Sequence, residues 1–419
     1  MQKKLLYILL AFILVACGAT SEKPDSASVY PDKQMHRSEK RGVAFGFARL
    51  DDAMLLSPSI SWFYNWGPDF RVVDLDTWFA LDSVVFFPMA WNGGYNAERI
   101  KAYATAHPNC KYLLAYNEPN LNDQAHMTPS AAAQNWPSLK ALATELDLKI
   151  VSPAMNYGTL EGYHDPIKWL DEFFELVPLS DVEAIAVHCY MSSVSALESY
   201  IDMFSKYGKQ IWLTEFCAWD PVPGNAEVQM NYMCEALNML EQKPQVERYA
   251  WFIPRTSSSV DSAPYMQLLT HSSPSELTDA GKIYTKFSSF DKSVWLDASR
   301  GVPANSYIAL SDNNIQIRPC EGTDSMMIKN LSEGKWVEYQ LFIPEGSKEL
   351  QICFASPVTC SVAYYIDGTI MDIAETGRSG ETMVDWIVWQ IPTTLPSGRH
   401  SLRVLMGRGS MNMKWIKIS

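Results

Sequence analysis

Apolar and polar positions follow two different patterns along the chain, and the change falls near residue 290. Before it, short continuous apolar runs take turns with longer segments in which apolar residues recur every three or four positions. Continuous apolar runs are typical of parallel strands covered on both faces, and the longer spacing is typical of helices. Eight runs of the first kind predict strands at Gly42–Phe47, Ser61–Trp66, Ser83–Trp91, Lys111–Asn117, Lys149–Met155, Ala184–Tyr190, Gln210–Phe216 and Arg248–Ile253.

The segments between these strands predict helices, among them Asn96–Ala106, Ser130–Leu146, Pro166–Leu176, Val194–Lys206 and Ala226–Gln242. Eight β/α units over about 250 residues match the size of a (β/α)8 TIM barrel, so residues 41–290 are expected to form one. A doubly wound open sheet is the alternative α/β arrangement, but no GxGxxG motif follows the first strand.

After residue 290, strand patterns follow one another without helices between them. They lie at Tyr307–Ala309, Asn314–Arg318, Ser325–Ile328, Trp336–Phe342, Glu349–Ala355, Val362–Ile366, Asp385–Gln390, His400–Leu405 and Met413–Ile418. Turn residues separate them, and this spacing is typical of a β-sandwich. Residues 291–419 are therefore expected to form an all-β, jelly-roll-like sandwich.

The N-terminus predicts an exported and anchored protein. A positively charged start precedes the apolar run Leu5–Val15, which has the length of a signal peptide and is short for a transmembrane helix. The run leads into Val15-Ala16-Cys17, which resembles a bacterial lipobox, so residues 1–17 are expected to be a lipoprotein signal peptide with lipidation at Cys17. An ordinary cleaved signal is the alternative. Residues 18–40 are polar and predict a flexible tether, which places the protein in the bacterial cell envelope, on either membrane face.

Composition limits the partners. The net charge is −13 and no basic run follows Lys40-Arg41, so no nucleic acid is expected as a partner. Fourteen Trp and twenty Tyr favour a glycan ligand. No CxxC motif or His/Cys cluster indicates a metal, and no cofactor is expected. The chain is expected to be a monomer that is attached to the membrane only through its lipid anchor.

Two predicted strands end in the same way, with one glutamate after a β-rich apolar run. Cys110–Asn120 carries Glu118 at the end of the fourth strand, and Gln210–Asp220 carries Glu215 at the end of the seventh. In a TIM barrel, these strand ends form the catalytic face. A lone strand-end glutamate is more often a surface charge. Two on facing strands predict a retaining glycosidase, which needs an acid and a carboxylate about 5–5.5 Å apart.

The residues around these glutamates resemble a known family. Asn117-Glu118-Pro119 is similar to the strand-four motif of clan A retaining glycosidases, and Leu213-Thr214-Glu215-Phe216 is similar to their strand-seven motif. More narrowly, the barrel resembles glycoside hydrolase family 128, the endo-β-1,3-glucanases with a glycosyl hydrolase catalytic core. Other matching pieces are Trp62-Phe63-Tyr64-Asn65-Trp66-Gly67-Pro68, Val151-Ser152-Pro153-Ala154 and Val187-His188-Cys189-Tyr190. The family tends to carry Asp where Asn120 stands.

The resemblance implies that Glu118 is the general acid/base, that Glu215 is the nucleophile, and that Asn117 hydrogen-bonds the 2-hydroxyl of the sugar in subsite −1. Strand parity puts His188 and Tyr190 on the same side of the sixth strand. Tyr190 could hold the nucleophile ionised and His188 could orient it or touch sugar, with packed core side chains as the alternative. Further candidates for substrate binding lie at or near strand ends: Asn65, Trp66, Trp91, Trp219 and Trp251. At least two of these tryptophans are expected to line the cleft.

The C-terminal part, residues 300–419, resembles family 6-type carbohydrate-binding modules. The similar pieces are Glu333-Gly334-Lys335-Trp336-Val337-Glu338-Tyr339, Ile366-Asp367-Gly368 and Trp415-Ile416-Lys417-Ile418. Tyr364, Trp386 and Trp389 are candidates for a sugar platform, although strand aromatics are more often core. The domain is expected either to target glycans or to cap the barrel.

Together these features predict a lipid-anchored, retaining endo-β-1,3-glucanase that hydrolyses laminarin-like β-1,3-glucans by double displacement. Two alternatives remain open. One is another clan A β-glycanase acting on β-1,4 or β-1,6 linkages, and the other is a non-catalytic glycan-binding surface lipoprotein. Both carboxylates and their neighbours are present, which argues against the second.

Overall fold

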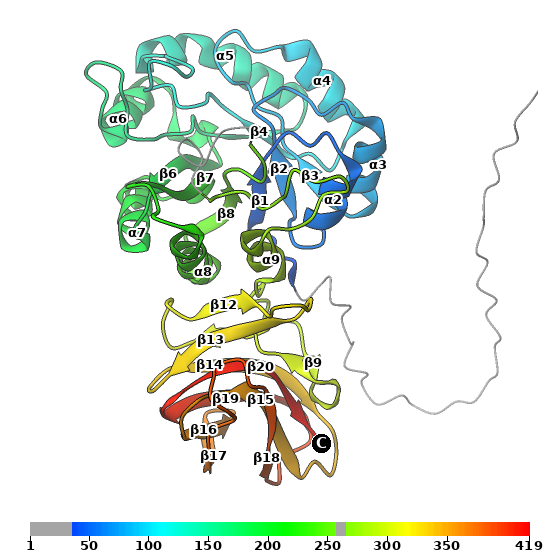
Figure 1. The fold of residues 1–419 in the computed structure, drawn as a ribbon. Helices are drawn as coiled ribbons and strands as arrows, with labels where there is room; N and C mark the ends of the chain where they lie inside the picture. The colour runs from blue at the N-terminus through cyan, green and yellow to red at the C-terminus, as the bar shows by residue number, and fades with distance from the viewer. Residues whose placement is uncertain (1–35, 257–264) are drawn as a thin grey trace, which may run out of the picture.

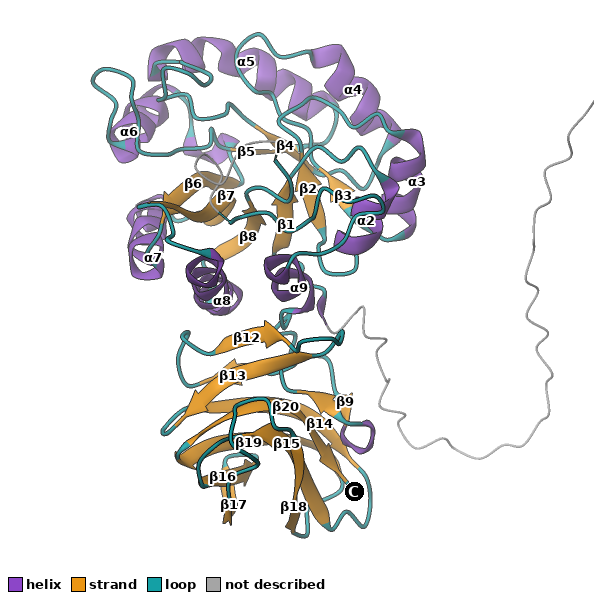
Figure 2. Cartoon of the chain, in the orientation of Figure 1, coloured by secondary structure: helices purple, strands orange, loops and turns teal. Residues whose placement is uncertain are grey.

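The chain folds into an α/β part followed by a part made almost entirely of strands. A computed structural model describes residues 36–256 and 265–419 (Figure 1). Figure 2 shows the helices arranged around one sheet in the first part, with the strands of the second part below them. The predicted signal peptide, its Cys17 and most of the predicted tether lie outside the described residues.

All eight predicted barrel strands are present. They are β1 (Arg41–Ala44), β2 (Trp62–Tyr64), β3 (Val85–Phe86), β4 (Tyr112–Leu114), β5 (Lys149–Val151), β6 (Ala184–Met191), β7 (Gln210–Asp220) and β8 (Val246–Trp251). They pair in parallel in the order β3-β2-β1-β8-β7-β6-β5-β4. The two ends of this order meet just beyond β3, where the Ala90 amide donates to the Leu114 carbonyl at 2.9 Å. The sheet therefore closes on itself as a (β/α)8 barrel.

Helices follow the strands and surround the sheet (Figure 1). They are α2 (Leu50–Leu56), α3 (Val73–Leu81), α4 (Ala97–Ala106), α5 (Pro129–Glu145), α6 (Pro166–Leu176), α7 (Val194–Met203), α8 (Ala226–Gln242) and α9 (Asp279–Lys286). Local signals explain where several begin. The Thr128 side chain accepts from the amide of Ala131 with Pro129 in the first turn, and Asp165 accepts from the amide of Ile167.

Aromatic side chains fill the half of the barrel interior that lies toward the N-terminal ends of the strands. The rings of Trp62 and Trp212 lie 5.4 Å apart, and Tyr112 lies 4.7 Å from Trp212. The guanidinium of Arg248 lies 5.0 Å from the centre of the Trp212 ring. Gly42 leaves room for this layer, because a Cβ there would come within 2.5 Å of the Trp62 indole. The interior is a packed core, so a ligand can enter only at the C-terminal ends of the strands.

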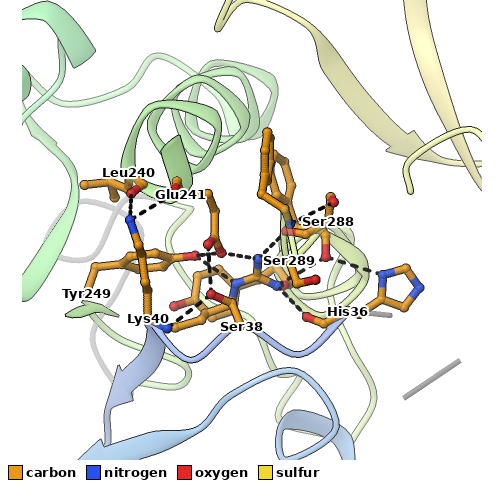
Figure 3. A network of polar contacts seen from close by, with 12 residues as sticks. His36, Ser38, Lys40, Leu240, Glu241, Tyr249, Ser288 and Ser289 are labelled. Carbon is orange, nitrogen blue, oxygen red and sulfur yellow. Dashed lines mark hydrogen bonds and ion pairs between the residues drawn. The ribbon is translucent and has the colours of Figure 1, made fainter. Parts of the chain in front are cut away.

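A buried polar network closes the opposite end of the barrel (Figure 3). Arg41 is fully buried and donates to Glu241 at 2.7 Å and to the Tyr249 hydroxyl at 2.9 Å. Ser38 donates to Glu241, and the Lys40 ammonium donates to three carbonyls at the end of α8. Residues 36–40 are therefore part of the barrel base. Their assignment to a flexible tether was wrong, because the side chains of Ser38 and Lys40 bind partners about two hundred residues away.

The C-terminal part contains two six-stranded sheets. One has the order β12-β13-β20-β15-β18 with β10 paired to β20, and the other has the order β11-β14-β19-β16-β17 with β9 paired to β14. The strands are β9 (Leu296–Asp297), β10 (Val302–Pro303), β11 (Ala309–Leu310), β12 (Gln316–Pro319), β13 (Met326–Ser332), β14 (Trp336–Ile343), β15 (Glu349–Ala355), β16 (Cys360–Ile366), β17 (Thr369–Thr376), β18 (Ile387–Pro392), β19 (Gly398–Arg408) and β20 (Ser410–Ile418). The region is mostly β-sheet, as expected, and jelly-roll topology remains a prediction.

Polar contacts join the two parts along α8. The Asn238 amide donates to the carbonyls of Asn313 and Ile315, and the Tyr307 hydroxyl donates back to Asn238 at 3.0 Å. Arg318 forms an ion pair with Glu227 at 3.1 Å. The barrel ends with α9 at Lys286 and the first C-terminal strand begins at Leu296, so the connecting segment is short.

Candidate active site

Two buried carboxylates lie at the C-terminal mouth of the barrel. Glu118 follows β4 and is 7% exposed, and Glu215 lies within β7 and is 4% exposed. The backbone of Glu118 has a φ of 44°, a left-handed conformation that is uncommon for a residue with a side chain and that is often found at functional sites. The sequence predicted both residues at this end of the barrel.

Three donors point at the Glu215 carboxylate. The Tyr64 hydroxyl donates to Oε1 at 2.8 Å, the Trp66 indole donates to the same oxygen at 2.7 Å, and the Tyr190 hydroxyl donates to Oε2. Burial and the charge of Glu215 raise the pKa of both tyrosines well above the ordinary value, so both hydroxyls keep their protons. Hydrogen bonds of this kind are short and fix the orientation of a carboxylate.

One imidazole ring connects the two carboxylates. His188 Nδ1 lies 2.9 Å from Glu118 Oε1, and His188 Nε2 lies 3.6 Å from Glu215 Oε1. His188 is fully buried. The Asn156 amide also donates to Glu118 Oε1, at 3.2 Å. The distance between the two carboxylates is therefore no greater than the width of one imidazole ring plus these two contacts.

The shared ring sets the protonation of Glu118. Burial by itself raises the pKa of Glu118, but the charge and hydrogen bond of His188, helped by Asn156, outweigh burial and lower that pKa below its ordinary value. Burial lowers the pKa of His188, but the charges of Glu215 and Glu118 outweigh it and raise that pKa. His188 therefore holds a proton to a higher pH than an isolated histidine, next to the carboxylate of Glu118.

A cavity of about 360 Å³ opens above the carboxylates, and aromatic side chains form most of its wall. Its lining comprises Trp66, Trp91, Asn117, Glu118, Gln124, Tyr190, Glu215, Trp219 and Phe252. Three of the four tryptophans expected near the cleft line it. The Asn117 amide nitrogen donates to Gln124 at 3.2 Å, whereas its buried oxygen has no hydrogen-bond partner among the described residues. A hydroxyl of a bound sugar is a suitable donor for that oxygen.

Two predicted binding residues are elsewhere. Trp251 is fully buried and its indole donates to the Met266 carbonyl at 2.7 Å, so the expectation that it lines the cleft was wrong. In β8, Arg248 faces the barrel interior, and the alternation of a strand turns Trp251 toward the helices. Asn65 does not line the cavity, because its side chain accepts from the Gly67 amide and donates to the Asp69 carbonyl within its own loop.

Sequence reasoning missed four residues of the site: Tyr64, Gln124, Asn156 and Phe252. Tyr64 shares strand parity with Trp62 and Trp66, and this signal was available in the sequence. Asn156, Gln124 and Phe252 lie beyond strand ends, where parity no longer fixes the direction of a side chain. Asn120 stands behind this group, since its buried amide donates to the Asn156 carbonyl at 2.7 Å.

No group of three or more His, Cys, Asp or Glu within residues 36–256 and 265–419 is arranged to hold a metal ion. None of the helices in these ranges has both the length and the apolar character needed to cross a membrane.

A closed parallel barrel with two buried carboxylates at its mouth, on strands four and seven, is the architecture of a glycoside hydrolase. Comparison with known proteins supports this class. The family described as "Glycosyl hydrolase catalytic core" matches residues 42–284. The chain is also 28% identical over 259 residues to Alkali-sensitive linkage protein 1 of Schizosaccharomyces pombe; the match covers 59% of this chain but only 44% of that protein.

Two solved structures are more similar in sequence. A family 128, subgroup II endo-β-1,3-glucanase from Pseudomonas viridiflava is 38% identical, with a TM-score of 0.54, and the match covers 59% of this chain and 98% of that one. A subgroup II enzyme from Sorangium cellulosum is 31% identical, with a TM-score of 0.53, and the match covers 59% and 97%. The chain therefore belongs to the glycosyl hydrolase catalytic core family, within glycoside hydrolase family 128.

Proposed function

We propose that the protein is a retaining endo-β-1,3-glucanase, with Glu215 as the nucleophile and Glu118 as the general acid/base. The observation that carries the proposal is the pair of buried carboxylates joined by His188 beneath an aromatic cavity. Retention requires two carboxyl groups close enough to act on one anomeric carbon from opposite sides. A single imidazole ring spans the gap, which puts both carboxyl groups within reach of one sugar ring, and the choice of retention follows the resemblance to clan A retaining glycosidases.

In the first step Glu215 attacks the anomeric carbon and forms an ester, while the bond from that carbon to the leaving oxygen breaks. The hydroxyls of Tyr64 and Tyr190 and the indole of Trp66 hold the Glu215 carboxylate in position before the attack. The leaving oxygen takes a proton from Glu118. The Glu118–His188 pair supplies this proton through the hydrogen bond at 2.9 Å, since the lowered pKa of Glu118 means that the proton of the resting pair is held mainly by the imidazole.

In the second step a water molecule replaces the departed sugar. Glu118 accepts a proton from this water, the hydroxide attacks the anomeric carbon, and the ester to Glu215 breaks, which regenerates the carboxylate. The unpartnered oxygen of Asn117 accepts from the 2-hydroxyl of the sugar. Trp66, Trp91, Trp219 and Phe252 provide flat apolar faces for the sugar rings.

The substrate class comes from the relatives. The two solved structures from Pseudomonas viridiflava and Sorangium cellulosum are described as endo-β-1,3-glucanases. We infer the same linkage and the same internal cleavage for this chain, on laminarin-like glucans.

The test is an assay on a polysaccharide panel with β-1,3-, β-1,4- and β-1,6-linked glucans. Reducing ends released from laminarin as oligosaccharides of several lengths are expected from internal cleavage. Release of glucose alone indicates exo action, and preference for another glucan indicates another β-glycanase. No release from any glucan indicates a binding protein.

We also propose that the protein is lipid-anchored through Cys17 in the bacterial cell envelope and works as a monomer. The lipobox-like residues before Cys17 support the anchor. Replacement of Cys17 by Ser is expected to release the protein from membranes into the soluble fraction. Membrane association that survives this change contradicts the anchor.

The C-terminal sheets are proposed to hold glycan near the barrel. One predicted platform residue does not support this role, since Tyr364 is 1% exposed and belongs to the core. Trp386 and Trp389 are half-buried, and Trp386 lies 4.4 Å below the Lys414 ammonium. Loss of laminarin retardation in affinity gels on replacement of Trp389 by Ala supports glycan binding, and unchanged retardation favours a structural cap.

A further inference from the structure

A second cavity, of about 600 Å³, lies between the barrel and the C-terminal sheets, far from the carboxylates. Its wall comes from the end of α9, from the segment around β10, and from strands β13, β15 and β20. Figure 1 shows α9 directly above these strands. The cavity has the size of a small-ligand site and is distinct from the proposed catalytic cleft.

The lining is basic although the chain is acidic. Asp324 is the only carboxylate among the lining residues. Four cationic side chains line the cavity: Lys286, Arg300, Lys414 and Lys417. Asp324 lies 4.0 Å from Lys286 and is fully exposed to solvent, and Arg300 lies 3.4 Å from Asp297, which is outside the lining. Within residues 36–256 and 265–419, no carboxylate lies within ion-pair distance of Lys414 or Lys417. Gathered like charges destabilise a fold until an anion neutralises them.

One buried side chain also points to a ligand. Asn305 lines the cavity and is 2% exposed. Its amide nitrogen donates to the Lys286 carbonyl at 2.7 Å, which fixes the orientation of the amide. Its oxygen has no hydrogen-bond partner among the described residues. A buried acceptor without a partner is costly, so a donor such as a hydroxyl is expected here.

The sheet face adds a flat surface. Trp415 and Lys417 alternate onto the same face of β20, and Gln351 of β15 pairs directly with Lys417. All three line the cavity. An indole next to cationic groups and an amide matches a ligand that has apolar ring faces, hydroxyl donors and a negative charge together.

We propose that this cavity binds a sugar that carries a carboxylate, sulfate or phosphate group. Lys414 and Lys417 pair with the anionic group, Trp415 stacks on the ring, and a hydroxyl reaches Asn305. The site goes beyond the proposed glucanase function, because β-1,3-glucan is neutral. It would hold the enzyme on an acidic glycan while the barrel acts on a neighbouring glucan.

The test is isothermal titration of the intact protein with galacturonate oligomers, sulfated oligosaccharides and mannose 6-phosphate, at low and high salt. Neutral maltooligosaccharides and inorganic sulfate are the reference probes. At least one acidic sugar is expected to bind at least tenfold more tightly than either reference, with affinity that falls as salt rises. The sugar that binds identifies its anionic group. Equal binding of inorganic sulfate, or no preference for any acidic sugar, overturns the proposal.

Matched variants locate the binding. The double variant K414S/K417S is expected to lose at least tenfold in affinity. R300S removes another cation from the cavity wall, at a side chain that is 70% exposed; it is expected to weaken binding of the same sugar and covers the case in which the double variant does not fold. K348S removes an exposed lysine of the same domain outside the cavity and is expected to bind within twofold of wild type. Laminarin hydrolysis is expected to be unchanged in all of them. Equal loss in K348S means that binding is non-specific and contradicts the proposal.

Discussion

Two buried charged clusters lie at opposite ends of the barrel, and their hydrogen bonding differs. At the base, Arg41 and Glu241 form an ion pair at 2.7 Å and are also bound by Tyr249 and Ser38 (Figure 3). Neither has a buried polar atom without a partner among the described residues. At the mouth, Glu118 and Glu215 share a single imidazole, and the facing atoms of Asn117 and His188 have no hydrogen bond.

This difference in hydrogen bonding indicates that the cluster at the base serves stability and the cluster at the mouth serves function. A buried charge that is paired and fully hydrogen-bonded costs little and is destabilising only when a partner is removed. A cluster with an excess of negative charge and polar atoms without partners costs stability, and it can recover this cost only when a ligand pairs with those atoms. We therefore expect changes at the base to affect unfolding and changes at the mouth to affect turnover.

The largest expected effect is on turnover at the mouth. Replacement of Glu215 by Gln removes the nucleophile and is expected to lower kcat on laminarin about 10⁴-fold or more, with unchanged or greater resistance to urea. Steady-state kinetics and urea unfolding measure the two effects. Glu183→Gln, at the opposite end of the barrel where the side chain is 43% exposed, is the control and is expected to retain activity. Near-wild-type turnover of the Glu215 variant rules out its role.

Removal of the proposed acid is expected to have a smaller effect. Glu118→Ala is expected to lower kcat on laminarin by about 10²–10⁴-fold, the usual contribution of general acid–base catalysis. Activated aryl glycosides need less help from an acid, so added azide is expected to restore product formation from them. Absence of rescue together with normal binding contradicts the assignment of Glu118.

At the base the expected effect is on stability. Arg41→Met leaves Glu241 buried without its cation, which is expected to lower the free energy of unfolding by about 3–5 kcal/mol. Turnover by the folded fraction is expected to stay unchanged. Arg71→Met is the matched control, because the Arg71 side chain is 64% exposed and such a surface pair contributes about 1 kcal/mol or less. Equal loss in both variants shows that the buried network adds nothing.

The smallest expected effect is a shift in pH dependence. The raised pKa of His188 means that its contribution to stability is complete below pH 6.5, its ordinary pKa, and is lost as pH rises through the raised value. His188→Asn removes the proton store next to Glu118, so the basic limit of kcat/KM is expected to move down by about one pH unit or more.

The control for this shift is His107→Asn, since His107 binds Asp76 and the Tyr103 carbonyl away from the site. Its pH profile is expected to match the wild type. An unshifted profile in the His188 variant shows that Glu118 carries its proton without the imidazole.

The sequence predicted most of the barrel because its strands are buried on both faces. Continuous apolar runs marked all eight strands, and helices α6 and α8 were predicted with the bounds that the structure shows. Three short helices, α2 and α3 near the start and α9 at the end of the barrel, were not among the predicted helices. Strand β17 was also missed, because it is exposed over most of its length and shows no apolar alternation.

Within the site, the sequence indicated residues inside strands better than residues after them. Tyr190 follows from alternation along β6, and Tyr64 was available by the same rule, whereas Glu215 reaches the interior only because the register of β7 shifts between Leu213 and Glu215. The prediction for Trp251 was wrong because it used only the position of this residue at a strand end. It did not consider whether the side chain faces the barrel interior or the helices. Asn156 donates to Glu118 from a loop, and only the three-dimensional structure brings these two residues together.

The account depends on retention through Glu215, and the stereochemistry of the first product tests it most directly. Proton NMR of a laminari-oligosaccharide digest, recorded before mutarotation equilibrates the new reducing ends, identifies the anomer that the enzyme releases. Double displacement predicts the β-anomer as the initial product. Initial release of the α-anomer contradicts the proposed mechanism, because it requires a single displacement by water.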